Sequence, residues 1–196
     1  MHLVLIGPPG CGKGTQAARV ALACRLPHIS TGDILRRAIA SGSLLGDAVR
    51  DSMSRGELVS DEIMTDLVAD RLADLDATAG FVLDGFPRTV EQAYALDVLM
   101  EERGPLAVVE LSVPDDELVR RLSRRRIVEG REDDDESVVR ERLRVYHRTT
   151  QPVIDFYKLR RTLLTVNGNL PPEEVTERIT LSVDPVFDEY FTGNFE

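Results

Sequence analysis

Short, mostly apolar runs alternate with longer amphipathic segments along most of the chain. Apolar runs without a polar face are typical of strands that are buried on both sides of a parallel sheet. The longer segments repeat apolar residues at helical spacing, as over 63–75. Strands are expected at 3–6, 28–29, 81–83, 108–112 and 163–166. The pattern predicts an α/β fold with a five-stranded parallel sheet flanked by helices, and ligands bound at the carboxyl ends of the strands.

Three segments depart from this simple alternation of strands and helices. Residues 30–59 contain small helices broken by Gly42 and Gly46, and we expect them to form a movable flap. A long helix is predicted over 136–158, and Pro152 must kink or interrupt it because proline has no backbone N–H. No element is predicted for the last dozen residues.

The composition narrows the class of protein. The chain has 196 residues, of which 42% are hydrophobic and 30% charged, and this suits one folded α/β domain with a full core. The formal charge of −10 argues against a general affinity for nucleic acid or for anionic membranes. Any anionic ligand must therefore be held by a local cluster of positive charge.

The cysteines and the start of the chain indicate a cytoplasmic protein. Cys11 and Cys24 form no C-x-x-C pair, and no Cys/His group has the spacing of a metal site. We therefore expect neither a disulfide nor a structural zinc. The chain enters its first apolar run at once, which leaves no room for a signal peptide. No stretch approaches the roughly 18 apolar residues of a membrane-spanning helix.

Residues 7–15 read Gly-Pro-Pro-Gly-Cys-Gly-Lys-Gly-Thr and directly follow the first apolar run. A strand, a glycine loop and a helix in this order are the setting of a P-loop, whose backbone N–H groups and helix N-terminus bind phosphate. Lys13 adds a full positive charge that can reach the outer phosphates. Gly14 stands where the common motif has Ser or Thr, so a hydroxyl ligand for magnesium from Thr15 is not assured. The alternative is a glycine-rich turn without a ligand, which this context strongly disfavours.

Asp84 ends the apolar run at 81–83 and precedes Gly85. In P-loop proteins an Asp at the end of a core strand faces the magnesium ion, directly or through water. Asp is also a common helix or turn cap, and this is the alternative interpretation. The position after a buried strand favours the metal-facing role.

The helix predicted after Pro114 carries a run of arginines. Arg121 and Arg125 are four residues apart and therefore share one face of that helix. A run of charge usually forms a solvated face, and we expect some of these arginines to do so. The run consists of Arg120, Arg121, Arg124, Arg125 and Arg126.

Four separate segments carry a resemblance that spans nearly the whole chain, from about residue 1 to 179. They are Gly-Pro-Pro-Gly at 7–10 with Lys-Gly-Thr at 13–15, Ser-Thr-Gly-Asp at 30–33, Asp-Gly-Phe-Pro-Arg-Thr at 84–89 with Gln92, and Gly130-Arg131 with Asp133-Asp134. Together they resemble the adenylate kinase family, and they are jointly very specific because they occur in the family's order. The family's phosphate loop reads Gly-Lys-Gly-Thr, which accounts for Gly14.

The resemblance implies a P-loop NTPase fold in a single nucleotide kinase domain over 1–196, with a monophosphate-binding flap at 30–59 and a short lid at 125–135. It implies reversible phosphoryl transfer from ATP to AMP, which gives two ADP. Mg²⁺ would be bound through the nucleotide phosphates and water, with Asp84 nearby. A lid this short resembles eukaryotic cytosolic members and some bacterial ones, without the zinc that some long lids hold. A monomer is implied, with no nucleic-acid or membrane partner.

The resemblance also implies a role for individual residues. Thr31 and Gln92 would read the adenine of AMP, although a plain helix cap is the alternative for Thr31. Arg121 would stack on the ATP adenine. The ATP site would comprise Gly10, Cys11, Gly12, Lys13, Gly14, Thr15, Arg121, Arg125 and Gly168. The AMP site would comprise Thr31, Arg36, Glu57, Leu58, Val59, Gly85, Arg88, Gln92, Arg131 and Arg142. The catalytic residues would be Lys13, Arg88, Arg125, Arg131 and Arg142.

Three other functions compete with this one. A UMP/CMP kinase has the same fold, but that family tends to lack Thr at position 31 and to carry Asn where this chain has Thr89. A non-catalytic nucleotide-sensing module would not need the whole set of cationic residues. A GTPase switch is excluded because the chain has no N-K-x-D motif. For a nucleotide kinase no general base is needed, because the acceptor is already an anionic phosphate oxygen.

Overall fold

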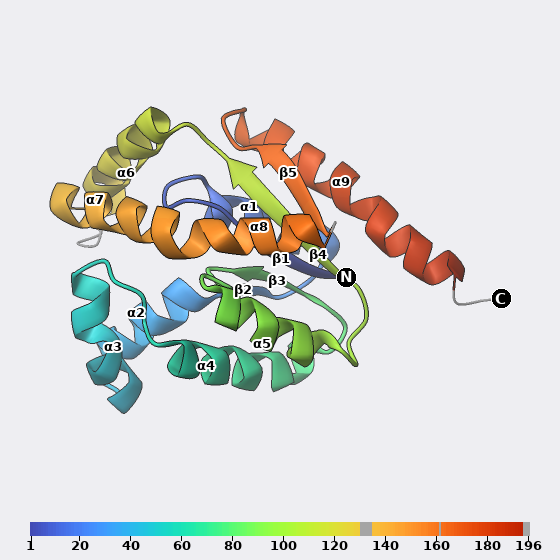
Figure 1. Ribbon diagram of the computed structural model, residues 1–196, viewed down its shortest axis with the longest axis horizontal. Helices are drawn as coiled ribbons and strands as arrows, with labels where there is room; N and C mark the ends of the chain where they lie inside the picture. Colours follow the sequence, from blue (N-terminus) through green and yellow to red (C-terminus); the bar gives the residue numbers. More distant parts are fainter. Residues whose placement is uncertain (130–134, 161, 194–196) are drawn as a thin grey trace.

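The computed structural model contains one five-stranded parallel sheet (Figure 1). It describes residues 1–129, 135–160 and 162–193. The strand order is β2 (His28–Ser30), β3 (Phe81–Asp84), β1 (His2–Ile6), β4 (Leu106–Ser112) and β5 (Leu163–Asn167). The predicted α/β fold and all five predicted strands are confirmed. Because β1 is the central strand, the phosphate loop that follows it opens at the middle of the sheet's carboxyl edge.

Alternate residues of the strands face two apolar cores. In β1, Val4 and Ile6 belong to one core and Leu3 and Leu5 to the other, and all four are at most 2% exposed. Burial on both faces explains why the apolar runs show no period-two alternation. The first core lies against α4 (Asp61–Ala73), α5 (Val90–Met100) and α8 (Gln151–Leu159), and the second against α1 (Lys13–Cys24) and α9 (Pro172–Gly193) (Figure 1).

Hydroxyl caps fix the starts of three helices around the carboxyl edge. Ser30 Oγ accepts from the backbone N–H of Asp33 (3.3 Å) at the start of α2 (Thr31–Ser41). Ser60 and Thr89 cap α4 and α5 in the same way. The cap of α2 is therefore Ser30, and the Thr31 hydroxyl is available for another contact. The predicted small helices of residues 30–59 are α2 and α3 (Leu44–Ser54).

The long helix predicted over 136–158 is interrupted, as expected from Pro152. The segment consists of α7 (Glu136–Val145), a π-helical turn η3 (Tyr146–Thr150) and α8. The backbone N–H of Gln151 bonds to the carbonyl of Tyr146, five residues back. Pro152 follows in the first turn of α8, where its missing N–H leaves no intrahelical bond unmade.

The chain continues as helix where no element had been predicted. α9 extends to Gly193 and includes Pro185. Val183 is buried, and Val186 and Phe187 pack against the core beneath α1 and α9. These apolar positions explain why the helix persists through the acidic end of the chain. The remaining elements are the helix α6 (Asp115–Glu129) and the short 3₁₀ turn η1 (Leu75–Ala77).

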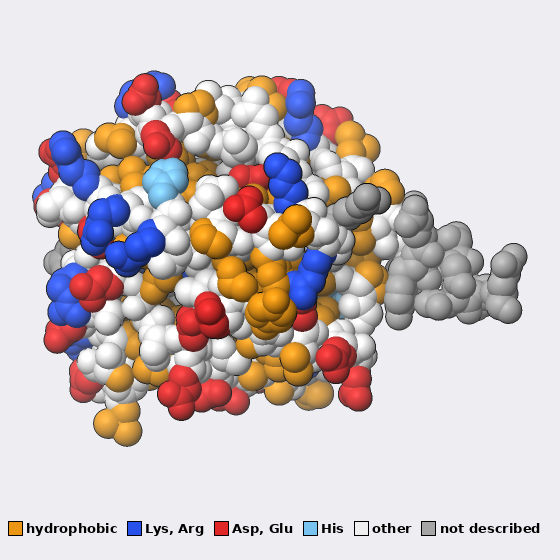
Figure 2. All heavy atoms as spheres, viewed as in Figure 1, with side chains coloured by type: hydrophobic (Ala, Val, Ile, Leu, Met, Phe, Trp, Pro, Cys, Tyr) orange, Lys and Arg blue, Asp and Glu red, His pale blue; other side chains and the backbone are white. Residues whose placement is uncertain are grey.

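On the face of the molecule in Figure 2, positive and negative charges are interspersed rather than separated by sign. Figure 2 shows Lys and Arg side chains among Asp and Glu side chains over one face. Some form ion pairs, such as Arg71 with Asp76 (2.7 Å) and Arg178 with Glu174 (2.7 Å). Across residues 1–129, 135–160 and 162–193, no helix combines the length and the apolar character needed to cross a membrane.

Candidate active site

A cleft of about 980 Å³ lies at the carboxyl edge of the sheet. The phosphate loop, α2, the loop after α3, the end of β3, α6 and α7 all contribute to its walls. Apart from Arg131, which lies outside the described residues, every nucleotide-binding residue implied by the sequence lines this cleft. They are Gly10, Cys11, Gly12, Lys13, Gly14, Thr15, Thr31, Arg36, Glu57, Leu58, Val59, Asp84, Gly85, Arg88, Gln92, Arg121, Arg125, Arg142 and Gly168. Their individual roles remain predictions.

The phosphate loop presents backbone N–H groups and one ammonium to the cleft. Gly12 caps α1 in the left-handed region (φ 98°) and makes no side-chain cap hydrogen bond. The first-turn N–H groups of α1 are thus not covered by a capping side chain, which suits an anion. Lys13 Nζ donates to the carbonyls of Gly7 (2.7 Å) and Pro8 (2.9 Å), so the ammonium lies over its own loop.

Cys11 is a structural part of this loop. Its side chain is 2% exposed, and its Sγ lies 3.6 Å from Lys13 Nζ. Burial raises the pKa of the Cys11 thiol, and this effect outweighs the nearby ammonium, which lowers the pKa. The thiol is therefore neutral at physiological pH. A neutral thiol does not form an ion pair with Lys13, so the full charge of the ammonium can act on a phosphate.

Asp84 lies beside the first turn of α1. A Cβ at Gly14 would be 3.4 Å from Asp84 Oδ2, so the carboxylate faces the phosphate loop across ordinary contact distance. The predicted position of Asp84 at the end of its strand is confirmed, because β3 ends at this residue. A carboxylate in this position can accept hydrogen bonds from water around a phosphate-bound cation.

Two arginines and Thr31 line the cleft near the end of β3 and the start of α2. Thr31 is fully buried, and its Oγ1 donates to the carbonyl of Asp84 (3.3 Å). Arg88 Nε donates to the carbonyl of Gly85 (2.7 Å), which holds the guanidinium close to the end of β3. Arg36 pairs with Asp33 (2.6 Å), and both side chains are partly exposed. A half-exposed pair of this kind contributes little to stability.

Gln92 is held by polar groups from α4 and from the loop before α5. Its Oε1 accepts from the backbone N–H of Arg88 (2.8 Å), and its Nε2 donates to Asp61 Oδ1 (2.7 Å). The residue is 1% exposed and lines the cleft. The sequence analysis did not single out Asp61. No local pattern links it to Gln92, because the two residues are brought together only by the packing of α4 on α5.

Arg121 joins α6 to the loop that follows β5. Its guanidinium donates to the carbonyl of Gly168 (3.0 Å) and to Asn169 Oδ1 (3.1 Å). On its other side it donates to Glu117 (2.8 Å), and this hydrogen bond lowers the pKa of the Glu117 carboxyl. α6 and the loop after β5, which were implied separately for the ATP site, therefore form one wall of the cleft.

The arginine run of α6 divides between the cleft and the surface. Arg121, Arg124 and Arg125 line the cleft. Arg120 pairs with Glu117, and Arg126 pairs with Asp135 (2.7 Å), with both arginine side chains more than half exposed. The expectation that part of the run would form a solvated face is confirmed.

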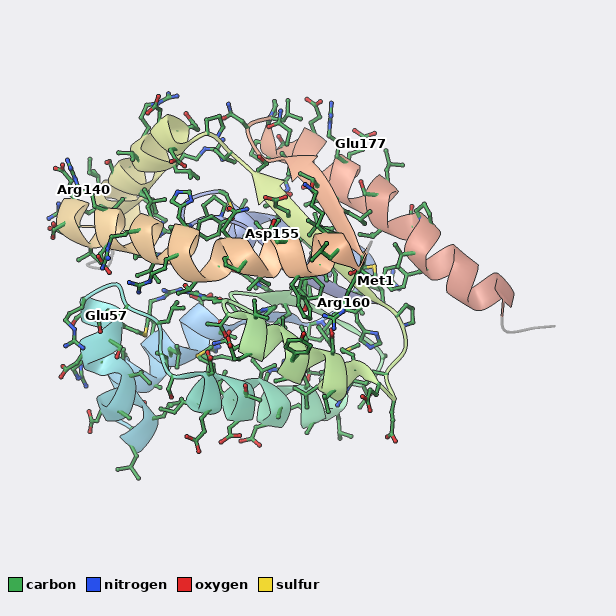
Figure 3. All side chains as sticks on the ribbon, in the orientation of Figure 1. Met1, Glu57, Arg140, Asp155, Arg160 and Glu177 are labelled. Carbon is green, nitrogen blue, oxygen red and sulfur yellow. The ribbon has the colours of Figure 1, made fainter. Side chains whose placement is uncertain are left out.

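Arg142 extends from α7 toward the loop after α3. A Cβ at Gly56 would lie 3.0 Å from Arg142 Cγ, and Gly56 has φ 71°, so a side chain here would meet both a clash and backbone strain. Figure 3 shows Glu57 on this loop and Arg140 at the outer end of α7. Of the predicted lid at 125–135, residues 125–129 and 135 are described, and residues 130–134 lie outside the described residues.

Comparison with known proteins gives a consistent result. Residues 5–162 match the family model described as adenylate kinase. The chain is 49% identical over 185 residues to an adenylate kinase of Xylella fastidiosa (strain 9a5c), covering 93% of this chain and 99% of that protein. It is 52% identical over 181 residues to an adenylate kinase of Xanthomonas campestris pv. campestris (strain 8004), covering 91% and 97%. It is 47% identical over 193 residues to an adenylate kinase of Trichodesmium erythraeum (strain IMS101), covering 95% and 99%.

Proposed function

Because this chain belongs to the adenylate kinase family, we propose that its cleft holds ATP on the side of the phosphate loop and Arg121, and AMP on the side of Thr31 and Gln92. The chain is a phosphotransferase that transfers a phosphoryl group from ATP to AMP. The observation that supports this arrangement is that one cleft joins the phosphate loop to Gln92. We also propose that the protein is a monomer in the cytoplasm, as the resemblance to the family implied.

Confined positive charge explains how an acidic protein brings two anions together. Besides Arg121, five of the implied cations line the cleft, and Arg131 would add a sixth to these five. Their combined field offsets the repulsion between the two phosphate groups and stabilises charge on the transferring phosphoryl. Closure of residues 30–59 and of the lid would exclude water, which would otherwise accept the phosphoryl group. The five are Lys13, Arg36, Arg88, Arg125 and Arg142.

The cleft fits magnesium that is held mainly by nucleotide phosphates and water. Among the residues with a described structure, no cluster of three His, Cys, Asp or Glu side chains could hold a metal ion. The single carboxylate Asp84 beside Gly14 suits an indirect contact through water. When bound, the ion would neutralise phosphate charge and orient the transferring group.

Selectivity for AMP tests the assignment of Thr31 and Gln92. A site that hydrogen-bonds one base should reject bases that leave its polar groups unpaired. In a coupled assay of ADP formation from ATP, with AMP, CMP, UMP and GMP in parallel, we expect kcat/KM for AMP to exceed the others by at least about a hundredfold. Equal or better turnover with UMP or CMP would refute AMP selectivity and favour the rival kinase.

The short lid predicts a protein without structural zinc. Its residues contain no cysteine, and Cys11 and Cys24 lie in the phosphate loop and at the end of α1. Elemental analysis of chelator-washed, active protein should therefore find no stoichiometric zinc. Tightly retained zinc whose removal also unfolds the protein would contradict the short-lid interpretation.

A further inference from the structure

We propose that Asp61 determines base specificity by locking the side-chain amide of Gln92 in one orientation. The inference rests on the proposed function, in which Gln92 reads the base of the acceptor nucleotide. It adds a residue outside the cleft lining and predicts which bases that residue excludes. Asp61 is the first residue of α4, and Gln92 lies in the first turn of α5.

A closed set of hydrogen bonds surrounds the amide. Gln92 Nε2 donates to Asp61 Oδ1 (2.7 Å), and Thr89 Oγ1 donates to the same oxygen (3.0 Å). The Thr89 hydroxyl accepts from the backbone N–H of Gln92 (3.2 Å) as the cap of α5. The backbone N–H of Arg88 donates to Gln92 Oε1 (2.8 Å).

The chemistry of these partners allows one orientation of the amide. An ionised carboxylate can only accept a hydrogen bond, and a backbone N–H can only donate one. Rotating the amide of Gln92 by 180° would place its oxygen against Asp61 Oδ1 and its NH₂ group against the N–H of Arg88. Both contacts would then be repulsive in a residue that is 1% exposed, where an unmet polar group is costly.

The locked amide has a fixed remaining capacity. A primary amide has two N–H donors and a carbonyl that accepts two hydrogen bonds, and one of each is used here. The oxygen end of Gln92 can therefore accept once more, and its nitrogen end can donate once more. Adenine and cytosine present an exocyclic amino group beside a ring-nitrogen acceptor, whereas guanine and uracil present a keto oxygen in place of that amino group. The fixed orientation of the Gln92 amide therefore favours bases with the exocyclic amino group over bases with the keto oxygen. The size of the base, purine or pyrimidine, must then distinguish AMP from CMP.

A purely structural role for Asp61 is the competing explanation. An acidic residue in the first turn of a helix favours that helix through the helix dipole. Glu62 provides a matched control, because it is the next residue of α4, carries the same charge and is exposed. Replacing Glu62 with Gln removes the same charge from the same turn without touching the amide of Gln92.

The test compares Asp61→Asn with Glu62→Gln. An asparagine amide can donate as well as accept, so Asp61→Asn removes one of the two groups that fix Gln92. We expect the kcat/KM ratios GMP/AMP and UMP/CMP each to rise by about tenfold in Asp61→Asn and to stay within about threefold of wild type in Glu62→Gln. Melting temperatures identify any loss of fold. If Asp61→Asn does not fold, Asp61→Ser gives the same test, because a hydroxyl also donates or accepts.

Each of the following outcomes either supports or overturns the proposed role of Asp61. Both ratios rising only in the Asp61 variant would support the lock. Unchanged ratios, or an equal loss with all four nucleotides, would overturn it and leave Asp61 as a structural residue. A wild-type enzyme that uses GMP as well as AMP would instead refute the proposed base-reading role of Gln92, and the lock with it.

Discussion

Replacing Lys13 with methionine should lower kcat for ADP formation by about a hundredfold to a thousandfold. In the proposed complex the Lys13 ammonium meets phosphoryl oxygens whose charge is stabilised in the transition state. Methionine keeps the apolar stem of the side chain but carries no charge. The carbonyls of Gly7 and Pro8 would lose their ammonium donor, so a small decrease in melting temperature should accompany the loss of activity.

Lys158 offers a control for this change. It is the other lysine of the chain, and it is exposed in the last turn of α8. Lys158→Met removes the same charge far from the phosphate loop and should leave kcat near the wild-type value. A folded Lys13→Met variant with kcat within about tenfold of wild type would remove Lys13 from the transferring phosphoryl group.

Arg142→Ala should lower kcat by at least about two orders of magnitude, with ATP affinity within a few-fold of wild type. An interaction that is made only in the transition state changes kcat more than it changes ground-state binding. Arg142 is suited to such a role because it lines the cleft from α7, an element separate from the phosphate loop. Pre-steady-state ATP binding and steady-state kcat, measured on the same preparation, separate the two effects.

Arg140→Ala is the matched control, since Arg140 lies two residues earlier on α7. Its side chain is 78% exposed and pairs with Glu136 (2.6 Å), a surface interaction worth at most about 1 kcal/mol. This variant should keep wild-type kcat and melting temperature. Near-normal kcat in a folded Arg142→Ala protein would show that Arg142 is only a surface residue and does not act on the transferring phosphoryl group. The assignment of the lid would then be wrong as well.

The phosphate loop could be predicted from the sequence because its determinants are local. A strand, a glycine loop and the helix that begins at Lys13 follow one another within about fifteen residues, and β1 and α1 form there as expected. Small helices after residue 30 were expected from equally local signals, although the residue that caps α2 is Ser30 and not Thr31. Hydrogen bonds between near neighbours are encoded by spacing alone.

The contact between Asp61 and Gln92 could not be predicted in this way. Each residue by itself has an ordinary local explanation, as a helix start and as a base reader. Their hydrogen bond depends on how α4 packs beside α5, and the sequence pattern carries no such distance. The helical end of α9 was missed for a related reason, because Val186 and Phe187 become informative only when the core beneath α9 is known. Arg131 falls outside the described residues and stays a prediction.

Because of the π-helical turn η3, the number of residues between α7 and α8 matters as much for the site as the identity of the residues that line the cleft. Val153, Ile154 and Tyr157 anchor α8 in the core, so α8 cannot rotate. Each residue of an α-helix turns the chain by about 100°. Deleting one residue from Tyr146–Thr150 would restore ordinary helical bonding and rotate α7 by that angle relative to α8. Arg142 would then leave the cleft although no cleft residue had been substituted. We therefore expect a one-residue deletion in η3 to lower activity about as much as the loss of Arg142 itself.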